Sequence, residues 1–298
     1  MGYVPKNNHT INPEGICGEI VSTEEYRYQQ AGALYTGSSS GIGRETARQL
    51  AVRGAKVTIT GRNAEALAET KRILVEAGAK ENDVLEVLGD IMDDEFAPKI
   101  VDDTIATFGR LDVLVNNAGA RIPDPQNRPG IEQPVQILDH NFALNVRTVV
   151  VISQRAVEHL ERTRGSIVNV SSLAGQPFVF KLSPYYPVAK AALDQLTVQM
   201  AGTLIEKGIR VNSVSPGVIK TNAAHRAGLP KDKEDEFYDN QGKDTDAVPL
   251  GRIGEAADIA KLIVFLADRS QSEFIVGQRY TADGGSSLKM VLATGPRS

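Results

Sequence analysis

The 298-residue sequence contains no tryptophan and one cysteine, and it has no long apolar run. A single cysteine, Cys17, cannot form an internal disulfide, so the fold must be stable in a reducing compartment. No stretch reaches the roughly 18 apolar residues that a membrane helix needs, and residues 1–19 lack the apolar segment of a secretory signal. We therefore expect a cytoplasmic protein without a membrane partner.

An excess of one charge is also missing. The chain carries 33 Lys and Arg against 37 Asp and Glu, a net charge of −4, which argues against nucleic acid as a partner. The four histidines, His9, His140, His159 and His225, show no ligand spacing with Cys or acidic residues, so no metal site is expected. The Gly-x-Ser-x-Gly elbow of α/β hydrolases is absent from the sequence as well.

Short β-branched runs alternate with longer amphipathic stretches from about residue 31 onward. The β-branched runs cover residues 55–60, 83–88, 111–116, 166–171 and 209–215. Helical periodicity marks residues 44–54, 63–78 and 255–269. This alternation predicts βαβ units, and hence a parallel sheet with helices on both faces.

The domain organisation follows from the same pattern. We expect one domain over 31–286, a polar extension over 1–30 that is mobile or contacts another subunit, and a tail over 287–298. Residues 222–249 interrupt the alternation after a strand. Because α/β sheets place substrate lids at the carboxyl ends of strands, we predict a lid there; a solvated surface helix is the alternative.

A glycine-rich motif, TGSSSGIG, occupies residues 36–43 between a predicted strand and a helix that starts near Arg44. Its glycines are Gly37, Gly41 and Gly43. Glycine allows a tight turn and a close approach of the backbone to a pyrophosphate, whose charge the amides of a helix N-terminus favour. The motif therefore predicts a phosphate-binding turn.

A second motif combines Ser172 with the segment YPVAK at 186–190. Lys190 lies four residues after Tyr186, so on a helix both share one face, where the ammonium would favour the phenolate. This pairing predicts Tyr186 as general acid in a carbonyl reduction and general base in the reverse oxidation. Ser172 would donate a hydrogen bond to the substrate oxygen, while Ser171 would face away. The rival Tyr185 is predicted to be pocket wall or packing.

The two motifs together resemble those of the short-chain dehydrogenase/reductase superfamily, over about residues 31–286. The sequence is most similar to the tropinone-reductase and glucose-dehydrogenase-like members of the short single-domain branch of that superfamily. The resemblance implies an α/β, doubly wound Rossmann fold with a seven-stranded parallel sheet in the order 3-2-1-4-5-6-7, and a homodimer or homotetramer. It also implies Asn145 as a fourth catalytic residue, holding a water that relays protons toward the lysine.

The resemblance further implies the cofactor contacts, with Asp90 at the adenine, Asn117 lining the cofactor, and Ile219 and Thr221 at the nicotinamide carboxamide. The full set expected at the cofactor comprises Gly37, Ser39, Ser40, Gly41, Ile42, Gly43, Arg62, Asn63, Asp90, Asn117, Ala118, Gly119, Tyr186, Lys190, Pro216, Gly217, Ile219 and Thr221.

The choice of cofactor should be decided at the end of the second strand. An acidic residue there would bind a ribose 2′-hydroxyl and repel a 2′-phosphate, but this chain has Gly61 followed by Arg62. A guanidinium can meet a phosphate with two parallel hydrogen bonds, so NADP(H) is predicted over NAD(H). Ser39, Ser40 and Asn63 are the predicted helpers.

These observations predict an NADP(H)-dependent oxidoreductase that interconverts a ketone and a secondary alcohol. The alternatives are an NAD(H)-dependent alcohol or sugar dehydrogenase, and a catalytically silent cofactor-binding scaffold. The pocket is expected to be lined by Phe178, Val179, Phe180, Tyr185, Phe237 and Tyr238, which favours a cyclic or otherwise apolar ketone.

One element is weak. Gly32 and Tyr35 stand in the first strand where aliphatic β-formers are usual, so its β-propensity is poor.

Overall fold

The computed structural model describes residues 28–177, 183–223 and 229–289. Phe178, Val179 and Phe180, predicted above as pocket wall, lie outside these ranges, as do residues 1–27 of the predicted extension and residues 290–298 of the tail. Across the described helices, none combines the length and apolar character needed to cross a bilayer.

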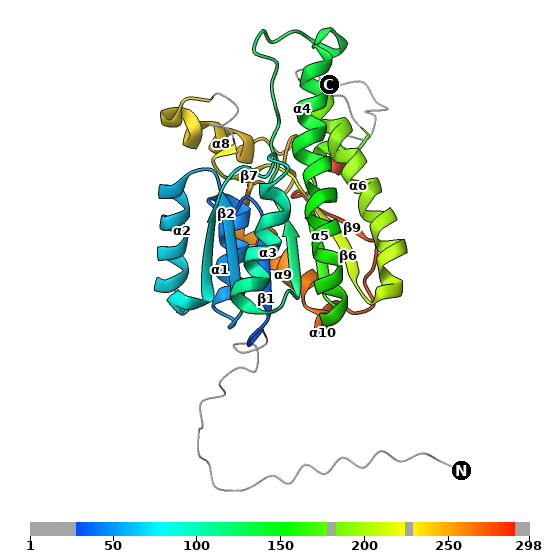
Figure 1. Ribbon diagram of the computed structural model, residues 1–298. Helices are drawn as coiled ribbons and strands as arrows, with labels where there is room; N and C mark the ends of the chain where they lie inside the picture. The colour runs from blue at the N-terminus through cyan, green and yellow to red at the C-terminus, as the bar shows by residue number, and fades with distance from the viewer. Residues whose placement is uncertain (1–27, 178–182, 224–228, 290–298) are drawn as a thin grey trace, which may run out of the picture.

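A seven-stranded parallel sheet forms the centre of the described fold, in the order β3-β2-β1-β4-β5-β6-β9 (Figure 1). Its strands are β1 (Gly32–Tyr35), β2 (Lys56–Gly61), β3 (Val84–Leu88), β4 (Val113–Asn116), β5 (Ser166–Val170), β6 (Arg210–Pro216) and β9 (Arg279–Ala282). The predicted order 3-2-1-4-5-6-7 is thereby confirmed. The last strand is numbered β9 because two short strands, β7 (Ile219–Lys220) and β8 (Gly254–Glu255), precede it and form a separate parallel pair.

Helices cover both faces of the sheet, as predicted (Figure 1). They are α1 (Gly41–Ala51), α2 (Ala64–Glu76), α3 (Phe96–Phe108), α4 (Val135–Phe142), α5 (Thr148–Thr163), α6 (Tyr185–Leu204), α8 (Glu234–Lys243), α9 (Ala256–Ala267), α10 (Arg269–Ser272) and α11 (Ser286–Lys289). One core cluster joins α1, α2 and α9 to the sheet, and the other joins α3, α5 and α6. Side-chain alternation divides β1 between them: Ala33 and Tyr35 pack in the first cluster and Leu34 in the second.

The strand β1 forms despite its poor propensity, because tertiary packing decides it. Its four residues are buried and pair with β2 on one side and β4 on the other. Gly32 is required by space: a Cβ there would lie 2.1 Å from the carbonyl oxygen of Arg110. The N–H of Gly32 donates to Asp112 Oδ2 at 2.8 Å, which fixes the start of the strand.

Tyr28 falls in the predicted extension and packs against the domain. It is 7% exposed, and its hydroxyl donates to the carbonyl oxygen of Val264 in α9 at 3.1 Å. Its backbone N–H also donates to the carbonyl oxygen of Arg53 at 3.2 Å. Contacts with the domain therefore reach at least to Tyr28.

Candidate active site

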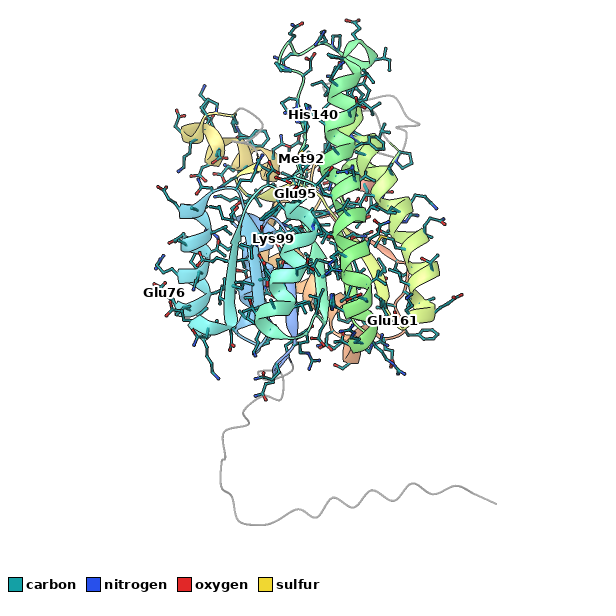
Figure 2. The ribbon with its side chains drawn as sticks, in the orientation of Figure 1. Glu76, Met92, Glu95, Lys99, His140 and Glu161 are labelled. Carbon is teal, nitrogen blue, oxygen red and sulfur yellow. The ribbon has the colours of Figure 1, made fainter. Side chains whose placement is uncertain are left out.

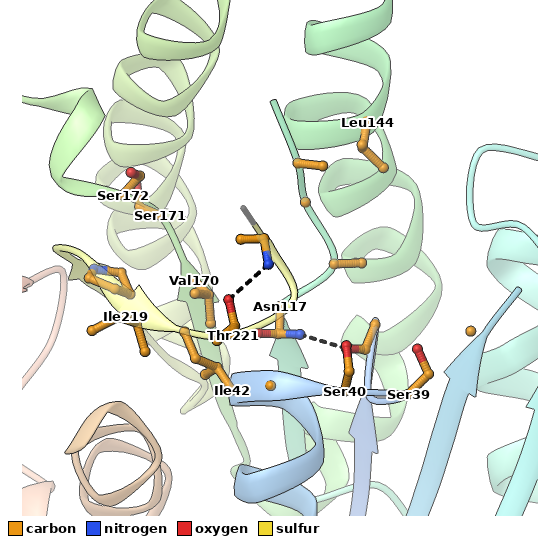
Figure 3. A pocket seen from close by; sticks show the side chains of 18 of the residues that line it. Ser39, Ser40, Ile42, Asn117, Leu144, Val170, Ser171, Ser172, Ile219 and Thr221 are labelled. Carbon is orange, nitrogen blue, oxygen red and sulfur yellow. Dashed lines mark hydrogen bonds between the residues drawn. The ribbon is translucent and has the colours of Figure 1, made fainter. Parts of the chain in front are cut away.

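A cavity of about 460 Å³ opens at the carboxyl ends of the strands, between the β1–α1 loop, α6 and α8 (Figure 3). The predicted site residues that line it are Gly37, Ser39, Ser40, Gly41, Ile42, Arg62, Asp90, Asn117, Ala118, Gly119, Ser172, Tyr186, Lys190, Pro216, Gly217, Ile219 and Thr221. The lining also includes residues that the sequence did not single out, such as Gly89, Ala120, Leu144 and Val170. Gly89, Ala120 and Leu144 are each adjacent to a predicted site residue, and Val170 is the last residue of β5. Their positions in the sequence could therefore have indicated them.

The glycine-rich turn has the geometry that its glycines permit. Gly37 and Gly41 adopt φ values of +63° and +56°, a region that side chains disfavour. A Cβ on Gly43 would lie 2.5 Å from both Asn117 Nδ2 and the carbonyl oxygen of Gly37. That amide donates to the carbonyl oxygens of Thr36 and Gly37 at 3.0 and 2.9 Å. Asn117 therefore connects the end of β4 to the turn by hydrogen bonds, and the missing side chain of Gly43 leaves space for its amide.

The first turn of α1 fits a phosphate group. Ser40 is the N-cap residue, its side chain does not cap the helix, and the first turn carries no acidic residue. Backbone N–H groups at a helix start lack intrahelical partners and attract anions. With glycine at three positions of the turn, the backbone itself can approach a pyrophosphate, so the residues present fit a dinucleotide.

The end of β2 lacks an acidic residue, and its geometry disfavours one. A Cβ on Gly61 would lie 3.0 Å from the Cβ and Oγ of Ser39. Arg62 is 72% exposed, and its Nη1 lies 3.5 Å from Asp90 Oδ2, a long surface pair that contributes little and can open readily. Arg62 and Asp90 both line the cavity. The Arg62 guanidinium thus lies at the position where the sequence predicts binding of the 2′-phosphate.

Asn63, predicted to help bind the cofactor, caps a helix in the structure, and its role at the cofactor stays a prediction. Its Oδ1 accepts a hydrogen bond from the backbone N–H of Ala66 at 2.7 Å and so caps α2. The residue is not part of the cavity lining.

The predicted lid residues lie over the other end of the cavity. The hydroxyl of Tyr238 in α8 donates to the carbonyl oxygen of Thr221 at 2.7 Å, and the Phe237 and Tyr238 rings meet edge to face at 5.3 Å. Thr221 in turn approaches the glycine turn, since a Cβ on Gly41 would lie 3.0 Å from its Cγ2 (Figure 3). The α8 helix is therefore anchored to the segment after β7 that lines the cavity.

Ser172, Tyr186 and Lys190 converge where β5 ends against the start of α6. Ser172 caps the turn Leu173–Gly175 and hydrogen-bonds Tyr186 through its side chain. Lys190 is buried; its Nζ donates to the carbonyl oxygen of Val170 at 3.0 Å and lies 5.8 Å from the centre of the Tyr186 ring. The helix begins at Tyr185, so Pro187 falls in its first turn, where its missing N–H costs nothing.

Ser171, predicted to face away, is also among the residues that line the cavity. It is buried, and its Oγ donates to the carbonyl oxygen of Lys190 at 3.3 Å. It therefore supports α6, while Ser172 is the serine that meets Tyr186.

The ionisation of the pair differs from the expectation. Burial raises the pKa of Tyr186, the hydrogen bond from Ser172 lowers it in part, and the charge of Arg121 lowers it further. Burial also lowers the pKa of Lys190 to about 8, against the attraction of Asp194, which raises it. In the protein alone, the cost of burial therefore outweighs the effects of Ser172 and Arg121 on the pKa of Tyr186.

Asn145 occupies a π-helical turn, Ala143–Arg147, that interrupts the helices α4 and α5. Such turns are frequent at functional sites. Its Nδ2 donates to the carbonyl oxygens of Ala120 and Asn141 at 3.0 and 2.9 Å, whereas its Oδ1 has no partner among the described residues. A Cβ on Gly119 would lie 2.8 Å from this Oδ1 and 3.0 Å from Lys190 Nζ. An unused acceptor thus faces the region of the lysine.

Asp194 lies one turn beyond Lys190 on α6 and is 1% exposed. Its Oδ1 is 3.5 Å from Ser213 Oγ, and its Oδ2 has no hydrogen-bond partner in the described part of the chain. Asp194→Asn should lower the pKa of Lys190 below about 8, because the variant removes the charge that opposes desolvation. Lys190 would then lose its charge at a lower pH, and the decline of ketone reduction with rising pH should move in the same direction.

This prediction can be checked by following the Lys190 side chain by ¹³C NMR during a pH titration. Asp139→Asn, in α4, provides a control that leaves the buried pair intact. An unchanged Lys190 titration in the Asp194 variant would show that the carboxylate does not support the lysine charge.

Tyr185 is packing rather than pocket wall. It is buried, its hydroxyl donates to the carbonyl oxygen of Gln133 at 2.9 Å, and it is not part of the cavity lining. Phe237 and Tyr238 do line the cavity. An apolar wall therefore remains, supplied by α8 and by Leu144.

Comparison with known proteins places this geometry in a family. A family model described as enoyl-(acyl carrier protein) reductase matches residues 37–287. Cis-4-hydroxycyclohexanecarboxylate dehydrogenase of Sinomonas cyclohexanicum is 37% identical over 254 residues, which cover 85% of this chain and 95% of that protein.

Two solved structures extend the comparison. A short-chain dehydrogenase/reductase of unknown function from Caenorhabditis elegans, solved with cofactor, has 42% sequence identity and a TM-score of 0.87, covering 90% of this chain and 98% of that one. A 7α-hydroxysteroid dehydrogenase complexed with NADH and 7-oxo glycochenodeoxycholic acid has 28% identity and a TM-score of 0.76, covering 88% of this chain and 96% of that one. The chain therefore belongs to the short-chain dehydrogenase/reductase superfamily of oxidoreductases, whose fold binds a nicotinamide cofactor.

Proposed function

We propose that the protein is an NADP(H)-dependent oxidoreductase that interconverts a ketone and a secondary alcohol. The observation that carries the proposal is the convergence of Ser172, Tyr186 and Lys190 on a cavity whose other end is a phosphate-binding turn. The bound nicotinamide would supply the hydride in reduction and accept it in oxidation.

The side chains of the protein would handle the oxygen and the proton. Ser172 Oγ–H donates a hydrogen bond to the substrate carbonyl oxygen and so stabilises the charge that develops there. Tyr186 Oη–H gives that oxygen its proton in reduction, and the phenolate takes the proton back in oxidation. Lys190 favours the phenolate that reduction leaves behind, and Asn145 Oδ1 is the acceptor available for a water that would return the proton from solvent.

The proposed preference for NADP(H) rests on Arg62 and on the absence of an acid at Gly61. We expect NADPH to bind at least tenfold more tightly than NADH, about 1.4 kcal/mol. The fluorescence of the nicotinamide reports binding, since the chain has no tryptophan. Arg62→Gln should remove most of the difference by weakening NADPH and leaving NADH unchanged.

The 7α-hydroxysteroid dehydrogenase named above was solved with NADH, so NAD(H) is the alternative cofactor to test here. Arg72→Gln is the matched control for Arg62→Gln, because Arg72 is an exposed arginine of α2 paired with Glu69 and Glu76. Equal affinity for NADPH and NADH in the unaltered protein would end the role of Arg62 and favour an NAD(H)-dependent dehydrogenase.

Two of the relatives reported above are tied to ring compounds by their names, and this supports a cyclic substrate here. One relative is named for a hydroxycyclohexanecarboxylate and another was solved with an oxo bile acid conjugate. The apolar wall of Leu144, Phe237 and Tyr238 is compatible with such a ring. A screen of cyclic and open-chain ketones with NADPH tests the proposal, and consumption of none of them would favour a silent cofactor-binding scaffold.

A further inference from the structure

Arg121 has no role in the chemistry described above, and it lies next to the residues that line the cavity without being one of them. It directly follows Ala120, a residue of the cavity lining, and is itself partly buried. Within residues 28–177, 183–223 and 229–289, every other partly or fully buried arginine makes a hydrogen bond or an ion pair, and Arg121 makes neither.

The backbone around Arg121 is fixed from both sides. Asn145 Nδ2 donates to the carbonyl oxygen of Ala120 at 3.0 Å. The side chain of Asn141 accepts from the N–H of Ile122 at 3.2 Å and donates to its carbonyl oxygen at 3.1 Å. Gly119, two residues before Arg121, is so close to the lysine that a Cβ on it would lie 3.0 Å from Lys190 Nζ. Arg121 is therefore held beside the catalytic group by the same helix that carries Asn145.

The charge of the guanidinium acts on the catalytic tyrosine. Arg121 is the charged residue that lowers the pKa of Tyr186, without a hydrogen bond to it. The two internal segments outside the described ranges, 178–182 and 224–228, contain no Asp or Glu, so neither can supply it with a carboxylate. Among the described residues the Arg121 guanidinium has no anionic partner, so its paired N–H donors are available to an anion.

We propose that Arg121 binds a carboxylate of the substrate, so that the substrate is an oxo acid or hydroxy acid whose carboxylate is separated from the reacting carbon by an apolar body. The separation follows because Arg121 lies just beyond the lining residue Ala120, while Ser172 and Tyr186 hold the carbonyl oxygen inside the cavity. The planar fork of an arginine matches a carboxylate with two parallel hydrogen bonds. The inference rests on the carbonyl chemistry proposed above. It specifies that the otherwise apolar ketone also carries a carboxylate.

The test compares matched ketones with and without the charge. The probes are 4-oxocyclohexanecarboxylate, 4-oxopentanoate and 5-oxohexanoate, each beside its neutral carboxamide, with NADPH or NADH as reductant. In the unaltered enzyme, kcat/KM for at least one acid should exceed that for its amide by about 10- to 100-fold, as expected for a hydrogen-bonded charge pair. In Arg121→Gln this ratio should fall close to one.

The ratio isolates binding from catalysis. Arg121→Gln also changes the pKa of Tyr186, but both members of a pair undergo the same proton transfer, so that effect cancels in the ratio. Arg162→Gln is the control, because Arg162 pairs with Glu158 near the end of α5 that Glu161 marks in Figure 2, far from His140 of α4. It should keep the ratio of the unaltered enzyme.

A binding measurement separates this inference from the proposed function. Cyclohexanecarboxylate and cyclohexanecarboxamide contain no ketone, and their binding to the protein–dinucleotide complex can be followed by saturation-transfer NMR. Tighter binding of the carboxylate that is lost in Arg121→Gln would support the Arg121 site even if no ketone turned over, and only the proposed function would then fall. Absence of any acid preference in both turnover and binding, or a preference that survives in Arg121→Gln, would overturn the inference.

Discussion

Tyr186→Phe is expected to lower kcat for ketone reduction by about 10³-fold, within the range that positioned proton transfer contributes, while the affinity for the dinucleotide changes little. The phenol is the group that Ser172 holds by a hydrogen bond, and phenylalanine keeps the ring that lies 5.8 Å from Lys190 Nζ. Only the proton donor is removed. The measurements are steady-state kinetics with a reducible ketone and, separately, a fluorescence titration with NADPH.

The neighbouring tyrosine supplies a matched control. Tyr185→Phe removes a buried hydroxyl whose hydrogen bond runs to Gln133, away from the cavity. It should cost about 1 kcal/mol of stability and leave kcat nearly unchanged. If Tyr186→Phe retained more than a third of the activity, Tyr186 would not be the general acid, and a scaffold or a different donor would have to be considered.

The fold was predictable because its pattern is local and repeated. Each buried strand reads as a β-branched run and each helix as a periodic stretch, and the strand order came from the family resemblance. The exception, β1, shows where propensity fails: Gly32 and Tyr35 are poor strand formers, but the strand is paired on both sides and Gly32 fits against a backbone carbonyl. Pairing and close contact come from residues far away in the sequence, so the residues of β1 alone could not show them.

The site was predictable wherever a motif fixes both residue type and spacing, as for Tyr186 and Lys190. Sequence reasoning is less specific where a side chain has a choice of partner. Asn63 could have met a cofactor or capped its own helix, and its Oδ1 takes the backbone N–H of Ala66. The ionisation of Tyr186 also depends on burial, which the spacing of a motif does not contain. Arg121 was overlooked because it stands outside the motifs and matters through the partners that it lacks.

Gly43→Ala should weaken dinucleotide binding by about 10- to 100-fold, the effect of 1–3 kcal/mol of overpacking at the phosphate-binding turn. Gly43 has a negative φ and lies in α1, so alanine suits its backbone and the penalty is steric alone. The new Cβ would meet Asn117 Nδ2 and the carbonyl oxygen of Gly37 at 2.5 Å, where Asn117 joins β4 to the turn. Either the turn or the amide must move, and both shape the surface offered to a pyrophosphate.

Gly202→Ala separates this effect from the general consequence of replacing a helical glycine. Gly202 lies in α6, and a Cβ there meets nothing within 4 Å. Its replacement should stabilise the protein by about 0.4–1 kcal/mol, through reduced freedom of the unfolded chain, and leave NADPH affinity unchanged. Thermal unfolding and the fluorescence titration measure both quantities for both variants. Since alanine is the better helix former at each position, opposite outcomes at the two sites would assign the loss at Gly43 to the contact with Asn117. Unaltered NADPH affinity in Gly43→Ala would instead show that the turn tolerates the methyl group, and that the close approach of this glycine does not shape the cofactor site.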